Sequence, residues 1–246
     1  MTLRMWPVPG KEKSNLICRA FYAGAPRWAI GCVFFGTEGV MDAFQAAKKS
    51  GEPWWYIDNA YFDKHRGIYF RVTKNALQCS GLGESDGERF AALKVEIKPW
   101  RDVPEGDILL TPQSDNFMKS TLGRTGDWAA ETLSKLHKWG FQQVRVRPWN
   151  RDKVKAAIAL LDELPKLRLL ITYSSASAIA AMLEGVPAIS EAGAANLLTG
   201  PLTSESVKDP PRSDDRLRFA QVLADNQFTL EEFRSGRAWA WLERRA

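Results

Sequence analysis

The chain has 246 residues, 45% of them hydrophobic, which is enough for one large domain or two small ones. Its formal net charge of +5 permits a polyanionic partner without requiring one. Three well-separated cysteines argue against a disulfide framework, and two histidines without ligand spacing argue against an imidazole-bound metal. The sequence has no apolar run long enough to span a membrane and no N-terminal signal core, so we expect a cytoplasmic protein without a membrane partner.

The first half of the chain contains a strand–helix–strand pattern. Residues 29–35 form a continuous apolar run, as in a fully buried strand, and a turn follows at 36–39. A helix is predicted over 40–49 and a second strand over 54–57. This order favours parallel pairing with a right-handed crossover, and a weaker alternation at 67–72 predicts a third strand.

The second half alternates strands and helices more regularly. Asp127 is a predicted N-cap for a helix that runs to Trp139. A second helix is predicted over 153–164, and a short third helix lies between the last two strands. The four strands are predicted at 107–111, 144–147, 167–172 and 188–189. Such alternation is typical of a doubly wound sheet.

The predicted fold is therefore α/β, with two small Rossmann-like parallel-sheet halves and C-terminal helices. The predicted domains are residues 1–103 and residues 104–200. A third segment, 201–246, comprises a linker and two short helices, which are predicted to pack back on the N-terminal half.

One strand end in the second half carries a hydroxyl-rich turn, made of Tyr173, Ser174, Ser175 and Ser177. Ligands of open α/β sheets bind beyond the carboxyl ends of strands, and a helix start favours phosphate through its free N–H groups and its dipole. The alternative is that one serine caps the helix and the others are incidental. Arg147 ends a neighbouring strand, where its guanidinium could clamp a phosphate; the alternative is a surface arginine on a half-exposed strand.

Three segments of the second half come in the order and spacing of a known domain: residues 107–113, 144–149 and 172–187. They resemble the nucleotide-sugar-binding domain of GT-B-type glycosyltransferases, above all the capsule-polysaccharide and glycerophosphotransferase-like branches. The resemblance covers about residues 105–190. Residues 227–239 also resemble the ends of phage-borne glycosyltransferase-like proteins, which suggests a phage-encoded member.

The resemblance implies a binding site for a nucleotide-sugar donor in the second half. The residues that match it are Gln113, Ser114, Arg147, Tyr173, Ser174, Ser175, Ser177 and Glu184. Two positions depart from the family. Trp149 stands where a histidine is common, and Ala180 stands where many members have a ribose-binding carboxylate, which leaves Glu184 as the nearby acid.

Glycosyl transfer needs a general base for the acceptor hydroxyl and groups that stabilise the departing diphosphate. Asp58 and Glu38 are the base candidates by position, because each follows a predicted strand of the first half. His65 is a third candidate, since an unperturbed imidazole titrates near neutral pH. The sequence lacks the Asp-x-Asp motif of metal-bridged transferases, so we expect a metal-independent enzyme with no cofactor besides the donor.

The sequence thus predicts a glycosyltransferase that moves a sugar from a nucleotide sugar to an acceptor hydroxyl. The basic charge, the tryptophan content and the phage-like tail favour a hydroxymethylated pyrimidine in DNA, which must leave the base stack to be reached. A glycan or a lipid-linked sugar is the alternative acceptor. The non-enzymatic alternative, favoured by Ala180 and Trp149, is a nucleotide- or nucleic-acid-binding protein that kept the fold. The sequence does not indicate an oligomeric state.

Overall fold

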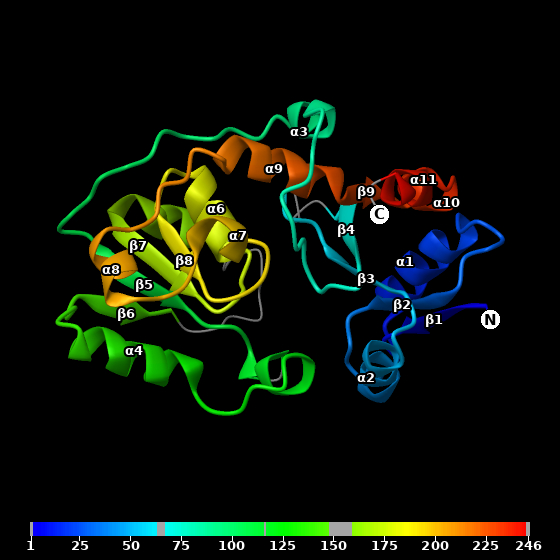
Figure 1. The fold of residues 1–246 in the computed structure, drawn as a ribbon, viewed down its shortest axis with the longest axis horizontal. Coiled ribbons are helices and arrows are strands. Elements are labelled where there is room, and N and C mark those ends of the chain that lie inside the picture. Colours follow the sequence, from blue (N-terminus) through cyan, green and yellow to red (C-terminus); the bar gives the residue numbers. More distant parts are fainter. Residues whose placement is uncertain (1, 63–66, 116, 148–158, 245–246) are drawn as a thin grey trace. The chain divides into compact units, whose positions relative to one another are not determined.

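The chain forms two compact units in a computed structural model that describes residues 2–62, 67–115, 117–147 and 159–244 (Figure 1). The first unit combines Met1–Lys94 with Ala220–Ala246, and the second is Val95–Phe219. The unit borders therefore fall nine residues before the predicted domain boundary at 103/104 and well after the one at 200/201. The assignment of the halves to acceptor and donor stays a prediction.

The sheet of the first unit has the strand order β1-β2-β3-β4-β9. Its strands are β1 (Leu3–Pro7), β2 (Gly31–Phe35), β3 (Trp54–Asn59), β4 (Tyr69–Lys74) and β9 (Gln227–Thr229). The first three strands pair in parallel, but β4 is antiparallel to β3, and β9 is antiparallel to β4. The α/β class is confirmed, whereas the prediction of a parallel sheet in this half is wrong for β4. The segment between Asn59 and Tyr69 is too short for a crossover helix, so the chain must turn back.

Helices cover both faces of this sheet. One face is covered by α1 (Glu12–Ala23), α10 (Leu230–Arg234) and α11 (Arg237–Glu243), and the other by α2 (Met41–Ser50). The same unit contains α3 (Glu88–Leu93). One hydrophobic core includes Phe21 of α1, Trp55 of β3 and Trp239 of α11. A second core lies against α2, where the Phe44 ring meets the Trp54 ring edge-on at 5.1 Å between centroids. Sequence patterns did not reveal β1 and α1.

The C-terminal helices pack directly on α1, and Figure 1 shows them in red beside the blue helix. The rings of Phe21 and Trp239 stack with centroids 4.5 Å apart, and Trp239 Nε1 donates to the Phe21 carbonyl at 2.8 Å. Gly24 ends α1 against the turn between α10 and α11. Gly236, with φ of 78°, separates α10 from α11.

The second unit has a fully parallel sheet, as predicted, with the order β6-β5-β7-β8. Its strands are β5 (Asp107–Thr111), β6 (Val144–Val146), β7 (Leu167–Thr172) and β8 (Ala188–Ser190), and its helices are α4 (Trp128–Lys138), α6 (Ser177–Leu183), α7 (Asn196–Thr199) and α8 (Ser204–Lys208). Asp127 caps α4 as predicted, accepting a hydrogen bond from Ala130 N at 3.0 Å.

Three further segments of the chain have regular structure. A π-helix spans Phe117–Thr121 and a 3-10 helix spans Leu164–Lys166, while α9 (Arg216–Asp225) leads the chain back into the first unit. The predicted linker after residue 200 contains α8. Most of the helix predicted over 153–164 lies outside the described residues, although residues 159–163 are helical. Within the described ranges, no helix is both long and apolar enough to cross a bilayer.

Replacing Gly24 by alanine should destabilise the first unit. A Cβ at this position would lie 1.9 Å from the Phe233 carbonyl oxygen, so the α1 end and the α10–α11 turn must separate. We expect a loss of about 1–3 kcal/mol in the free energy of unfolding, measured by urea denaturation. Gly81→Ala is the matched control, because a Cβ there meets nothing within 4 Å. Equal stability of the two variants would contradict the packing described.

Glu232 should make the stability of the first unit depend on pH. Burial alone raises the pKa of Glu232, but hydrogen bonds from Arg89 (2.8 Å) and from Thr229 N (2.9 Å) outweigh it and leave the pKa below its usual value. A carboxylate with a lowered folded-state pKa stabilises the fold above its unfolded pKa, and this contribution is lost as the pH falls through the folded value.

Glu232→Gln should therefore cost about 1–3 kcal/mol at pH 7, where hydrogen bonds to a charged group are lost. The difference from the parent protein should shrink once the pH falls below about 4.5. The exposed neighbour Glu231 provides the control variant Glu231→Gln, which should change little at either pH. Urea unfolding followed between pH 3.5 and pH 7 measures both variants, and a pH-independent effect of Glu232→Gln would show that the Glu232 pKa is not lowered by folding.

Candidate functional site

The carboxyl ends of all four parallel strands of the second unit lie at one edge of the sheet. The segments that follow these strands begin with Arg147 after β6, Pro112 after β5, Tyr173 after β7 and Glu191 after β8. Predicted donor residues therefore share one sheet edge because the strands are parallel. This edge is where open α/β sheets bind ligands.

Buried hydroxyls join the ends of β5 and β7 to the start of α6. Thr172 Oγ1 donates to the Thr111 carbonyl at 2.7 Å, and Thr111 Oγ1 lies 2.8 Å from Ser177 Oγ. Ser177 is 9% exposed, so its hydroxyl holds the helix start onto β5 instead of facing solvent. Ser175 Oγ accepts a hydrogen bond from Ser177 N at 3.2 Å, which orders the turn.

Gln113 and Ser174 are brought together across the sheet edge. Ser174 Oγ donates to Gln113 Oε1 at 2.9 Å, which leaves the amide nitrogen of Gln113 for a further acceptor. Ser114 lies on the same loop as Gln113, but its oxygen atoms accept hydrogen bonds from backbone N–H groups. Its Oγ accepts from Phe117 N at 3.3 Å and its carbonyl from Met118 N at 3.0 Å, at the start of the π-helix.

The two arginines near the end of β6 are engaged with carboxylates. Arg147 Nε lies 3.1 Å from Glu163 Oε1, and the other Glu163 oxygen pairs with Arg145 at 3.2 Å. Arg145 also pairs with Asp107 at 2.6 Å. The Arg147 side chain is 18% exposed, so a phosphate at this end of the sheet would meet a guanidinium already oriented by Glu163.

Glu184 does not join the hydroxyl turn. Ser177 opens α6 and Glu184 follows its last residue, so the two are about 10 Å apart along the helix axis. Glu184 instead forms an ion pair with Lys98 at 2.6 Å. Ala180 lies within α6, and Trp149 lies outside the described residues.

Three side chains around Tyr173 were not predicted from the sequence. Arg124 stands over the Tyr173 ring at 5.0 Å from its centroid, and the Trp128 ring meets that ring edge-on at 6.3 Å. Trp128 Nε1 donates to Glu191 Oε1 at 2.7 Å. Ligands bind beyond the carboxyl ends of strands, and applying this rule, the strand-end rule, to the predicted strand at 188–189 would have found Glu191. Arg124 sits in an irregular segment, and no pattern in the sequence pointed to it.

In the first unit, Glu38 and Asp58 both lie at the carboxyl edge of the parallel strands. Glu38 is exposed in the turn after β2, while Asp58 is the penultimate residue of β3 and is half-buried. Asp58 Oδ2 pairs with Arg71 at 2.6 Å, and Asp58 Oδ1 accepts from Asn59 N at 2.7 Å. His65, the third base candidate, lies outside the described residues.

Arg71 is a buried arginine that organises this edge. It is 8% exposed and donates to the Tyr61 hydroxyl and the Leu77 carbonyl, both at 3.0 Å. Burial alone lowers the pKa of Arg71, but Tyr61 and Asp58 raise it above its usual value, so the guanidinium stays charged. Burial also raises the pKa of Tyr61, which keeps its hydroxyl neutral. Asp58 is thus held by a fixed positive charge.

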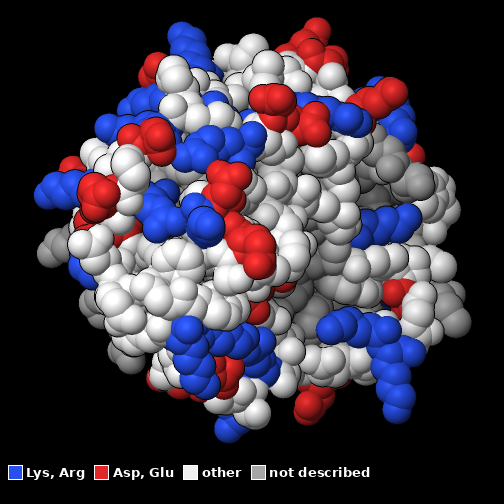
Figure 2. Space-filling model, turned by 60° about the vertical axis from the view of Figure 1, so that its left-hand side comes forward, with Lys and Arg blue, Asp and Glu red and all other residues white. Residues whose placement is uncertain are grey.

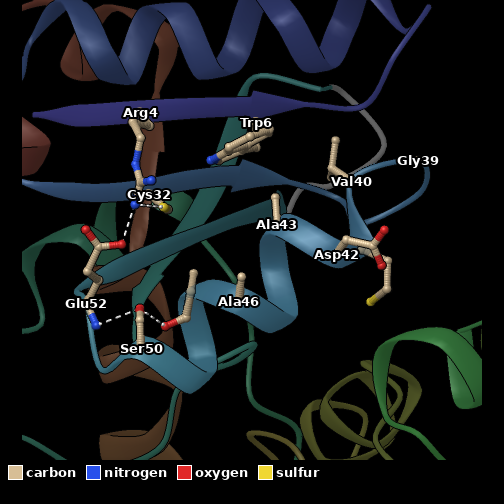
Figure 3. Close-up of a pocket in the computed structure, with 12 residues that line it drawn as sticks. Arg4, Trp6, Cys32, Gly39, Val40, Asp42, Ala43, Ala46, Ser50 and Glu52 are labelled. Atoms are coloured by element: carbon tan, nitrogen blue, oxygen red, sulfur yellow. Dashed lines mark hydrogen bonds and ion pairs between the residues drawn. The ribbon is translucent and has the colours of Figure 1, made fainter.

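The first unit also contains a pocket of about 780 Å³ between β1 and α2, shown in Figure 3. Arg4 and Trp6 of β1 and Cys32 of β2 face Ala43 and Ala46 of α2 across it. Burial raises the pKa of the Cys32 thiol despite the nearby Arg4, so a thiolate nucleophile is not expected there. The predicted site residues do not line this pocket, and we treat the sheet edge of each unit as a separate candidate site. The described part of the chain holds no cluster of three or more potential metal ligands of the His, Cys, Asp or Glu type.

Removing the Arg71 side chain should leave Asp58 without its counter-charge. We expect Arg71→Met to cost about 3 kcal/mol in the free energy of unfolding, the low end for a broken buried pair, because 34% of the Asp58 side chain remains exposed. The matched control is Arg4→Met, which removes an ion pair with Glu52 whose arginine is 48% exposed and should cost about 0–1 kcal/mol. Chemical denaturation measures both, and equal losses would contradict the structural role of Arg71.

No protein-family model matches the sequence, and no curated protein matches it. Solved structures that align with it include two transferases. The beta Kdo 2,7 transferase of KpsC from Thermosulfurimonas dismutans aligns with a TM-score of 0.53 and 11% identity, covering 100% of this chain and 99% of that one. The beta Kdo 2,4 transferase of KpsC from the same organism gives a TM-score of 0.49 and 15% identity, covering 90% of each chain. At 11% identity the likeness to the Kdo 2,7 transferase concerns the fold alone, and the α/β fold class expected from the sequence is confirmed.

Proposed function

We propose that the protein is a glycosyltransferase that moves a sugar from a nucleotide-sugar donor to an acceptor hydroxyl. The observation that carries the proposal is the pairing of Ser174 with Gln113, beside Ser175, at the carboxyl edge of the parallel sheet. In a fold shared with a sugar transferase, this edge offers hydroxyl and amide groups to an anionic, hydroxyl-rich ligand.

The donor would be bound by side chains that lie at this edge. Ser174, Ser175 and the Gln113 amide would contact the phosphate, with Tyr173 and Arg147 beside it. Ser177 supports them from beneath through Thr111. Glu191 takes the place we expected for Glu184, because it follows β8 at the same edge and one of its oxygens is not used by Trp128.

Glu38 is the better general base of the two described candidates. Both oxygens of Asp58 are engaged by Arg71 and Asn59, whereas the exposed Glu38 carboxylate has no hydrogen-bond or ion-pair partner among the described residues. We propose that Glu38 removes the proton from the acceptor hydroxyl as the bond to the sugar forms, and that Asp58 helps to shape the edge. The chemistry needs no metal in this proposal, since the hydrogen-bond donors at the edge of the parallel sheet would stabilise the leaving phosphate.

The acceptor is more readily a saccharide than DNA. Basic and acidic side chains alternate over the face shown in Figure 2 and form no continuous basic stripe there. Duplex DNA is bound mainly through such stripes, because each phosphate contact needs a cation. One structural neighbour that aligns over 99% of its length is a Kdo transferase, so a Kdo nucleotide is the first donor to test. The hydroxymethylated pyrimidine of phage DNA remains the rival acceptor.

A transfer assay tests this proposal. The protein is incubated with a panel of nucleotide sugars that includes a Kdo nucleotide, together with oligosaccharides, hydroxymethylated DNA or plain DNA, and products are identified by mass spectrometry. We expect transfer to a saccharide. Glu38→Gln should lower kcat by about 10²-fold or more, as for the loss of a general base, while Ser175→Ala should mainly raise the KM of the donor.

Glu84→Gln is the control for the base, because Glu84 is also exposed on a loop of the first unit. Transfer to DNA and to no saccharide would show that the acceptor is the hydroxymethylated pyrimidine. Unchanged kcat in Glu38→Gln would remove Glu38 from the mechanism. Neither binding nor turnover of any nucleotide sugar would overturn the proposed function.

A further inference from the structure

A chain of hydrogen bonds runs from the buried Arg71 to the exposed Lys13 at the carboxyl edge of the first sheet. Arg71 pairs with Asp58 Oδ2 at 2.6 Å, and Asn59 Nδ2 donates to Asp58 Oδ1 at 3.2 Å. The other end of the Asn59 amide, Oδ1, accepts from Lys13 Nζ at 3.0 Å. Each link fixes the next, so the position of the ammonium depends on a buried guanidinium.

Two aromatic rings hold the same ammonium. Lys13 Nζ lies 5.3 Å from the centroid of the Phe70 ring and 5.9 Å from that of Phe35. A ring face attracts a cation, and together with the Asn59 oxygen these rings favour one side-chain position. Because the side chain is already ordered, binding a ligand there costs little conformational entropy.

The charge of Lys13 is not neutralised by its neighbours in this chain. Arg71 and Asp58 cancel each other, and Asn59 is uncharged. Among the described residues no carboxylate pairs with Lys13, and an ammonium has three donors, of which the Asn59 contact uses one. The ordered, exposed Lys13 ammonium therefore has two further N–H donors with which it can bind an anion.

We propose that Lys13 is an anion-binding residue at this edge, which takes a carboxylate or phosphate group of the acceptor. The part concerning the acceptor rests on the proposed function, because Glu38 and Asp58 lie at the same edge. Anion binding itself is independent of it. Asn59 acts as a positioning residue, because its amide is oriented by Asp58 and directs its oxygen to Lys13.

Titration with a simple anion tests the site directly. Inorganic phosphate is added to the isotopically labelled full chain at constant ionic strength, with chloride as the reference, and the Asn59 side-chain amide signals are followed by NMR. We expect saturable shifts in the parent protein and at least tenfold weaker binding in Lys13→Met. The matched control is Lys48→Met, since Lys48 also stands over a ring, that of Phe44 at 5.5 Å, but on α2.

Lys48→Met should bind phosphate as the parent does, and both variants should melt within about a degree of each other, since exposed substitutions change stability little. Non-saturable shifts in the parent, or unchanged binding in Lys13→Met, would overturn the proposal. The transfer assay supplies the second readout. Lys13→Met should raise the KM of an acidic acceptor about tenfold and leave that of a neutral one unchanged. A protein without transferase activity that still shows the Lys13-dependent shifts would overturn the proposed function and retain the anion site.

Discussion

The parallel pairing of β5 with β7 is the constraint on which the candidate donor site depends. It aligns Thr111 with Thr172 at the ends of the two strands, so that their hydroxyls and carbonyls bond across the sheet. Ser177 then ties α6 to the same point at 2.8 Å from Thr111 Oγ1. Because these groups are buried, leaving one without its partner is costly, and the loops after both strands are held in one arrangement. Ser174 and Gln113 meet as a consequence.

The first unit holds a buried positive charge, the Arg71 guanidinium. The Arg71 guanidinium is surrounded by Asp58, the Tyr61 hydroxyl and backbone carbonyls, which together satisfy it. Removing any of these partners leaves a buried group unpaired, so the network fixes Tyr61 just after β3 and Leu77 just after β4. The same network fixes Asn59 and, through it, Lys13. The proposed binding groups of both units are thus ordered by buried polar contacts beneath them.

Much of the second unit could be predicted from sequence. The strands β5 and β7 each contain an apolar run of three residues, and both were predicted with the observed bounds, while Asp127 marks the start of α4. The first unit was harder. In β1, Arg4 and Pro7 break the apolar pattern, and Lys11 opens α1 without a side-chain cap. The partner of β4 is β9, which lies more than 150 residues further along the chain, so no local pattern could reveal the antiparallel pairing.

The site was predicted by the same logic and within the same limits. The strand-end rule selected Gln113 and Ser174, but it could not show that Ser177 faces the sheet, because the direction of a hydroxyl depends on its partner across the strands. Glu184 was chosen for its nearness in sequence, and one short helix separates it from the turn. Arg124 and Trp128 contact Tyr173 from segments far away in the sequence, so no local pattern could predict these contacts.

The proposed function requires that a nucleotide sugar bind at the carboxyl edge of the second sheet. Hydrogen exchange, measured by mass spectrometry with and without saturating donor, tests this binding most directly. We predict slower exchange in two short segments, residues 111–115 and 172–177, and an unchanged rate in the segment of Gly81, far along the chain from the donor loops. Protection confined to the β1–α2 pocket, or to neither sheet edge, would contradict the proposed donor site.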